Sequence, residues 1–206
     1  PAELREVDLS EALLRIAAWS GDWQSFTWFE DPPPQTLVRA VDELTDLGVF
    51  STDRGQLTAL GELLALLPAH PSEGLALCWA THLECLDEVA SLCALAGSPR
   101  DVLEMAPDAK RAQDPWLRLE ALQDADRAHF WPNLNRAISR EVHLTAQQLK
   151  KRTRKIYRRV RALLTQAQEA SSSHTPDPEH LKLKDRVAFC FAQSSPRRVG
   201  KLRERS

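Results

Sequence analysis

The sequence predicts a mainly α-helical fold. Only seven of the 206 residues are glycine, and runs of β-branched residues are few, while Leu, Ala, Glu and Arg, which favour helices, dominate. At 43% hydrophobic residues, the chain can bury one or two cores of ordinary size. No stretch of about eighteen apolar residues and no signal peptide is present, so we expect a cytoplasmic protein with no membrane-spanning helix.

The segment 31–71 is the best-defined part of the pattern. Asp31 is followed by three prolines, which cannot continue a preceding helix. Apolar residues at helical spacing then predict a helix over 35–47, and Gly48 supplies its C-terminal stop. Residues 49–50 and 56–58 are expected to form two very short strands joined by a polar turn.

Thr58 can cap a closing helix that runs to Pro68. A further helix, which Asp8 or Ser10 can cap, precedes the segment and ends before Gly21. These elements together make a winged-helix pattern: the first helix, the helix over 35–47, a short β-hairpin wing and the closing helix.

An aromatic cluster lies between the first two predicted helices. It could form a platform on which nucleic-acid bases stack, or it could supply volume to a small helical core. The flanking acidic residues would repel phosphates, which favours the core. The cluster comprises Trp23, Phe26, Trp28 and Phe29.

A longer helical array is predicted beyond Pro71. Its prolines mark the starts and breaks of its elements. Thr145 is expected to cap the longest helix, and a Ser-rich linker over 171–178 should precede the last one. The expected helices cover 72–86, 87–96, 100–105, 107–113, 116–122, 146–170 and 178–192.

Charge is distributed unevenly along the chain. Residues 1–149 contain 11 Lys and Arg against 24 Asp and Glu, whereas residues 150–206 contain 16 against 5. Such a split suggests that one end meets an anionic partner, and nucleic acid is the usual one.

The positive charge is concentrated on the long helix. No acidic residue occurs between Glu141 and Glu169, so pairs four residues apart cannot neutralise the row within the helix. A row of cations about 1.5 Å apart per residue suits a sugar-phosphate backbone. The candidate nucleic-acid-binding residues are Lys150, Lys151, Arg154, Lys155, Arg158, Arg159 and Arg161.

Two other interpretations of this row remain open. The charges could be solvated or paired with the acidic first half of the chain. The helix could also lie on a membrane surface, but its apolar stripe is narrow and contains no Trp or Phe. We therefore expect no membrane partner.

The four cysteines show no CxxC pair. Cys78, His82 and Cys85 fall on one helix face and could hold a metal, given a fourth ligand. No fourth ligand can be identified, and free cysteines usually fill small gaps in a core. We therefore predict no metal site. Ser, His and Asp occur in no recognisable catalytic arrangement, so we also predict no catalytic residue.

DNA reading by the predicted winged helix is disfavoured. Many winged helices place their third helix in the major groove, but the helix over 35–47 carries Asp42, Glu43 and Asp46 against a single Arg39. Like-charge repulsion in a groove would have nothing to offset it. Docking against other protein is the more plausible role for this unit.

Three stretches resemble the region that follows the second motor domain of DEAH-box helicases. They are DLSEALLRIAAW, FEDPPPQTLVRAVDELTDLGVF and GQLTALGELLALLPAHP. The family's DPP, L…LG, LT.LG and LP.HP signals match here in order and spacing. The stretch HLTAQQLKKRTRKIYRRV is similar, less tightly, to the family's penultimate long helix, and bacterial HrpB-type members are the nearest relatives.

The resemblance implies three parts: a winged-helix domain over 1–70, a helical-bundle, ratchet-like domain over 71–174, and a linker, last helix and basic tail over 175–206. It implies that this chain is a piece of a longer ATP-dependent RNA helicase. The family's winged helix packs on the motor domains, and its bundle closes over a single-stranded RNA channel.

The same resemblance separates this chain from the catalytic machinery. The sequence contains neither GxxxxGK[ST] nor Asp-Glu-Ala-His, so ATP and Mg²⁺ would bind in motor domains outside it. The expected partners are those RecA-like domains of the same polypeptide and single-stranded RNA or DNA. The alternative is a non-catalytic helical adaptor that binds only proteins.

Overall fold

The computed structural model describes residues 8–53, 55–104, 114–124, 131–171 and 177–195. The mainly α-helical prediction is confirmed, and no β-strand occurs within these ranges. The helices are α1 (Ser10–Ser20), α2 (Pro34–Asp46), α3 (Ala59–Leu64), α4 (Pro71–His82), α5 (Leu86–Ala96), α6 (Pro115–Gln123), α7 (Arg136–Ser171) and α8 (Leu183–Gln193), with a 3₁₀ turn η2 (Pro178–His180).

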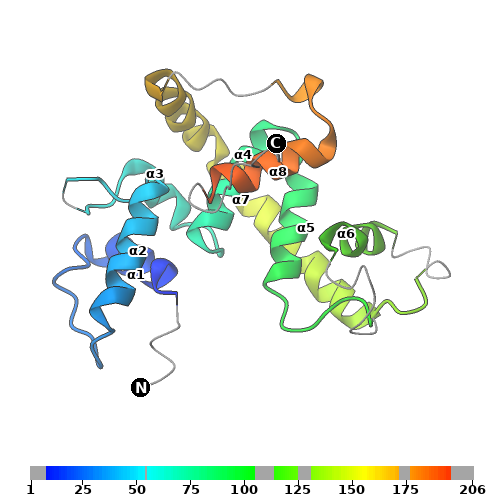
Figure 1. The fold of residues 1–206 in the computed structure, drawn as a ribbon, viewed down its shortest axis with the longest axis horizontal. Coiled ribbons are helices and arrows are strands. Elements are labelled where there is room, and N and C mark those ends of the chain that lie inside the picture. The colour runs from blue at the N-terminus through cyan, green and yellow to red at the C-terminus, as the bar shows by residue number, and fades with distance from the viewer. Residues whose placement is uncertain (1–7, 54, 105–113, 125–130, 172–176, 196–206) are drawn as a thin grey trace, which may run out of the picture.

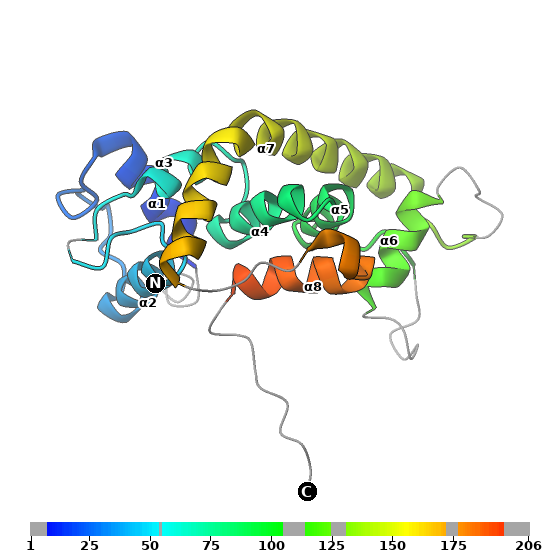
Figure 2. The same cartoon turned by 90° about the horizontal axis from the view of Figure 1, so that it is seen from above.

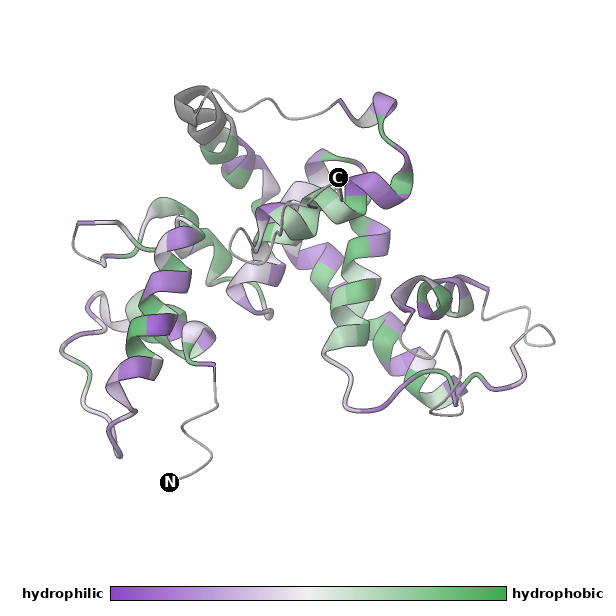
Figure 3. Cartoon of the chain, viewed as in Figure 1, coloured by the Kyte–Doolittle hydropathy of each residue, from purple (hydrophilic) through white to green (hydrophobic). Residues whose placement is uncertain are grey.

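The helices pack around the α4–α5 pair. Helix α7 lies along one side of α4 and α5, and α8 lies against α4 on the other side (Figures 1 and 2). Helices α1 to α3 gather at one end of the molecule and α6 at the other. One continuous hydrophobic cluster runs through these helices. Most helices also carry hydrophilic residues (Figure 3), whereas α4 is buried over most of its length.

The start and stop of α2 agree with the sequence prediction. Pro34 occupies the first turn, where its missing N–H leaves no bond unmade. Gly48 follows the end of the helix with φ of +69°, a conformation that glycine adopts without strain. The N–H of Val49 then donates to the carbonyl of Leu44 at 2.8 Å, which closes the last turn.

The predicted two-strand wing is wrong. The chain does reverse between α2 and α3, but the described residues of this connection form a single antiparallel bridge, between Phe50 and Leu57. Ser51 N donates to Gln56 O at 2.8 Å and closes the turn. Val49 still completes the end of α2, and Thr58 already begins α3, so too few residues remain for two strands.

Thr58 caps α3 as predicted. Its hydroxyl accepts from Gly61 N at 3.1 Å and reaches back to the carbonyl of Gly48 at 2.7 Å. One side chain therefore satisfies a free N–H of α3 and a free carbonyl beside the end of α2.

The predicted start of the longest helix is also wrong. Helix α7 begins at Arg136 rather than Ala146. Asn135 acts as its cap, because its side-chain oxygen accepts from Ile138 N at 3.2 Å. Thr145 lies inside the helix, where its hydroxyl donates to the carbonyl of Glu141 at 3.0 Å.

Other boundaries differ in smaller ways. Residues 100–104 are not helical, because Leu103 bridges Leu134 and Glu104 N donates to Asn133 O. The helix expected over 107–113 lies outside the described residues. The final predicted helix is divided into η2 and α8, and α4 is separated from α5 by a tight turn at 83–85.

The aromatic cluster joins the core only in part, because Trp23 and Trp28 are half-buried and pack against it. Trp23 stacks on Phe50 with ring centres 6.1 Å apart, and its indole N–H donates to Gly55 O at 3.0 Å. Phe26 meets Trp28 edge to face, whereas Phe29 is fully exposed. Among the described helices, none is both long and apolar enough to cross a membrane.

Candidate nucleic-acid interface

The buried side of α7 fixes which residues face outward. Along the basic stretch of α7, from Leu149 to Leu164, five side chains on this side are buried in the core. They recur at three- and four-residue spacing, as one face of a helix requires. The polar member, Thr153, satisfies its hydroxyl by donating to Leu149 O at 2.8 Å. The five are Leu149, Thr153, Ile156, Val160 and Leu164.

The cations of α7 lie on the opposite side. Six of the seven predicted binding residues are exposed, and Arg152, which the prediction omitted, is exposed beside them. From Lys151 to Arg161 the row covers about 15 Å of helix axis at 1.5 Å per residue. The six are Lys151, Arg154, Lys155, Arg158, Arg159 and Arg161.

Lys150 differs from the rest of the row. Its ammonium lies 2.6 Å from Asp87 Oδ1 of α5, and its side chain is 23% exposed. Within the described residues, it is the member of the row that forms an ion pair with an acidic side chain. Lys150 therefore helps to hold α7 against α5 and is the least available of the seven for a phosphate.

Tyr157 and His82 lie at the edge of this basic face, and the sequence prediction missed their pairing. The Tyr157 hydroxyl is 3.3 Å from His82 Nδ1, so the pair joins α7 to α4. Burial, and secondarily the positive charge of Arg161, lower the pKa of His82. A lone tyrosine within a run of cations was the available sequence signal.

The three residues weighed as a metal set do not converge. Cys78 is fully buried, and burial raises the pKa of its thiol to about 12, which disfavours the thiolate that a metal needs. His82 is engaged with Tyr157. Cys85 faces a different residue, Cys190.

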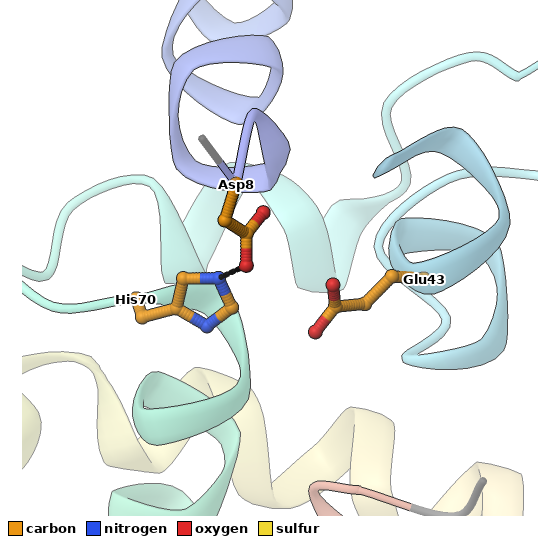
Figure 4. Close-up of side chains that lie close together, drawn as sticks. All are labelled: Asp8, Glu43 and His70. Carbon is orange, nitrogen blue, oxygen red and sulfur yellow. Dashed lines mark hydrogen bonds and ion pairs between the residues drawn. The ribbon is translucent and has the colours of Figure 1, made fainter. Parts of the chain in front are cut away.

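Asp8, Glu43 and His70 do converge, from the α1, α2 and α4 segments (Figure 4). One ligand atom from each lies within 4.8 Å of the others. His70 Nδ1 accepts from Ser72 N at 3.3 Å and so caps α4, while Nε2 lies 3.1 Å from Asp8 Oδ2. Ser10 donates to Glu43 at 3.0 Å.

This arrangement is a structural junction. With Nδ1 accepting, Nε2 carries the ring proton and donates it to Asp8. A cation would have to displace that hydrogen bond. The junction ties the first turns of α1 and α4 together beside α2.

Comparison with known proteins relates the chain to helicases. It is 29% identical over 107 residues to the probable ATP-dependent RNA helicase DHR2 of Saccharomyces cerevisiae, a match covering 52% of this chain and 14% of that protein. It is 31% identical over 98 residues to the pre-mRNA-splicing factor ATP-dependent RNA helicase prp22 of Schizosaccharomyces pombe, covering 47% and 8% respectively.

No family model matches the chain. The matched region spans a small part of each of these helicases. Over about half of its length, the chain shows a distant similarity, at about 30% identity, to DEAH-box ATP-dependent RNA helicases.

Proposed function

We propose that this chain is an accessory C-terminal region of an ATP-dependent DEAH-box RNA helicase. In this proposal it docks on the RecA-like motor domains and helps to hold single-stranded RNA. Residues 1–70 serve as the winged-helix-like docking part and residues 71–174 as the ratchet-like bundle. The exposed cation row of α7, with no acidic residue between Glu141 and Glu169, is the observation that carries the proposal.

Contact with the strand would be made through its phosphates. Guanidinium and ammonium groups read no base sequence when they bind phosphates, so recognition would be independent of sequence. The acidic outer face of α2, where Asp42 and Asp46 are exposed, is unsuited to a second phosphate contact.

A second surface supports docking on protein. Trp19 is 82% exposed at the end of α1, and Leu66 is 54% exposed after α3. Leu66 lines a hollow of about 470 Å³ together with Ala17, Gly21 and Leu57. Large exposed apolar side chains are typical of protein contacts.

The test measures binding of this chain to single-stranded RNA at several salt concentrations. The triple variant R154Q/R158Q/R161Q should weaken binding equally for RNAs of different sequence. It should also reduce the slope of log affinity against log salt by about 2, because each lost phosphate contact on a single strand contributes about 0.7.

A matched control removes the same charge elsewhere. Arg39, Arg100 and Lys182 are exposed and lie outside α7, so R39Q/R100Q/K182Q should leave the salt slope nearly unchanged. If the two triple variants weaken RNA binding equally, binding depends on the net charge of the chain and not on the cation row of α7. Failure of the wild-type chain to bind RNA at low salt would favour the protein-binding adaptor instead.

A further inference from the structure

Two of the four cysteines lie in contact with each other. Cys85 Sγ and Cys190 Sγ are 3.8 Å apart, although 105 positions separate them in the sequence. Cys85 stands at the turn between α4 and α5, and Cys190 lies in α8. Both are free thiols, and each is at most 1% exposed.

The turn between α4 and α5 aims Cys85 at α8. Glu84 adopts φ of +54°, the one non-glycine residue with positive φ in the described part of the chain. This conformation is unusual for a residue with a side chain. Cys85 N donates to Ala80 O at 2.9 Å and holds the turn closed.

Helix α8 is held against the same place by its own contacts. Phe189 meets Trp79 of α4 edge to face, with ring centres 5.8 Å apart. Arg186 donates to the carbonyl of Leu83 at 3.0 Å. These contacts bring Cys190 to Cys85 from the opposite side of the turn.

Arg186 also supplies a positive charge beside the pair. Its Nε is buried without a hydrogen-bond partner among the described residues. The hydrogen bond with Cys190, and then the charge of Arg186, outweigh burial and lower the pKa of Cys85. A thiolate at Cys85 is the reactive form towards oxidants.

We propose that Cys85 and Cys190 are a redox pair that closes to a disulfide and locks α8 onto the α4–α5 turn. The oxidant would be a peroxide. The Cys85 thiolate attacks one peroxide oxygen, breaks the O–O bond and becomes a sulfenic acid as hydroxide leaves and takes a proton. The Cys190 sulfur then attacks the Cys85 sulfur, and water leaves.

The overall reaction consumes two thiols and one hydrogen peroxide and yields one disulfide and two waters. Because both sulfurs are buried, reaction requires a local opening of α8, which exposes the two thiols together. The inference does not depend on the proposed RNA-binding role.

The simpler interpretation is that all four cysteines only fill gaps in the core. Cys78 and Cys93 fit it, because both are buried, burial raises the pKa of both, and the sulfur–sulfur hydrogen bond within the described residues joins Cys85 to Cys190. They are therefore internal controls for Cys85 and Cys190.

The experiment treats the purified wild-type chain with hydrogen peroxide and maps disulfides by mass spectrometry of peptides. We expect one Cys85–Cys190 link, loss of two of the four free thiols, and reversal by dithiothreitol. The melting temperature should rise by about 10 °C, since the link closes a loop of about 100 residues.

The variant C78A/C93A should form the same link, whereas C190S should not. Oxidation of wild-type Cys85 to sulfinic acid without a disulfide, or links to Cys78 or Cys93, would overturn the proposal. The peptide map of the wild-type chain decides the question even if a variant fails to fold.

Discussion

Gly61 of α3 packs directly against the backbone of Val49. A β-carbon at position 61 would lie 2.5 Å from Val49 O and 2.6 Å from Leu57 Cδ1, closer than real contacts of this kind. The glycine of the LT-x-LG motif is therefore required by the approach of α3 to the end of α2.

Gly61→Ala should destabilise the fold. The expected cost is about 1–3 kcal/mol for overpacking, which exceeds the helix propensity that alanine gains. Urea unfolding followed by circular dichroism measures it. Gly97→Ala is the matched control, because its β-carbon would meet its nearest neighbour, Cys93 O, at 3.5 Å. Equal midpoints for the two variants would contradict the close-approach argument.

Thr58→Val should remove the cap of α3 while keeping the side-chain shape. The variant loses the bond from Gly61 N and the bond to Gly48 O, at an expected cost of about 1–2 kcal/mol in unfolding free energy. Thr58→Ser keeps the hydroxyl and should lie close to wild type. A valine variant as stable as the serine variant would show that water replaces both bonds.

The helix limits within residues 31–71 were predictable from the sequence, whereas the backbone pairing between α2 and α3 was not. Three prolines, Gly48 and Thr58 act through their own backbone geometry, so they fixed the limits of α2 and α3 without knowledge of the rest. The prediction of a two-strand wing was wrong because the length of the strands depends on how many residues remain between the end of α2 and the start of α3.

Contacts between distant segments explain the other errors. Threonine is a residue type that often caps helices, but Thr145 does not cap α7. Asn135, ten residues earlier, is the cap, and the helix continues through Thr145. The basic face could be assigned by spacing within one helix. The pairing of Lys150 with Asp87, of Tyr157 with His82 and of Cys85 with Cys190 crosses 63, 75 and 105 positions, which periodicity cannot report.

Asp8→Asn should destabilise the chain more at neutral pH than in acid. Burial alone would raise the pKa of Asp8, but its bonds with Ser10 and His70 outweigh burial and lower it below 3.8. A carboxyl group whose pKa is lower in the folded state stabilises that state at pH values above 3.8, the ordinary pKa. This stabilisation is lost as the pH falls through the pKa of the folded state.

Thermal melts of wild type and Asp8→Asn at pH 7 and pH 3 measure this difference. The gap in melting temperature should narrow at pH 3. Asp22→Asn serves as the control, since Asp22 is exposed at the far end of α1. An unchanged gap at the two pH values would assign the effect of the mutation to lost packing instead of charge.

His82 should report phosphate binding at the basic face. Burial lowers the pKa of His82 below 6.5, and the charge of Arg161 lowers it further. Arg161→Gln should therefore raise the pKa of His82, measured by NMR titration of its ring protons, and Arg39→Gln should not. The value should stay below 6.5, because burial, the larger cause, remains.

Single-stranded RNA bound at Arg161 should produce the same upward shift in the wild-type chain. A phosphate neutralises the guanidinium charge and adds negative charge nearby, and both effects favour protonated His82. In Arg161→Gln the further shift on adding RNA should be smaller. RNA that binds at low salt without moving the pKa of His82 would place the contact away from this part of α7.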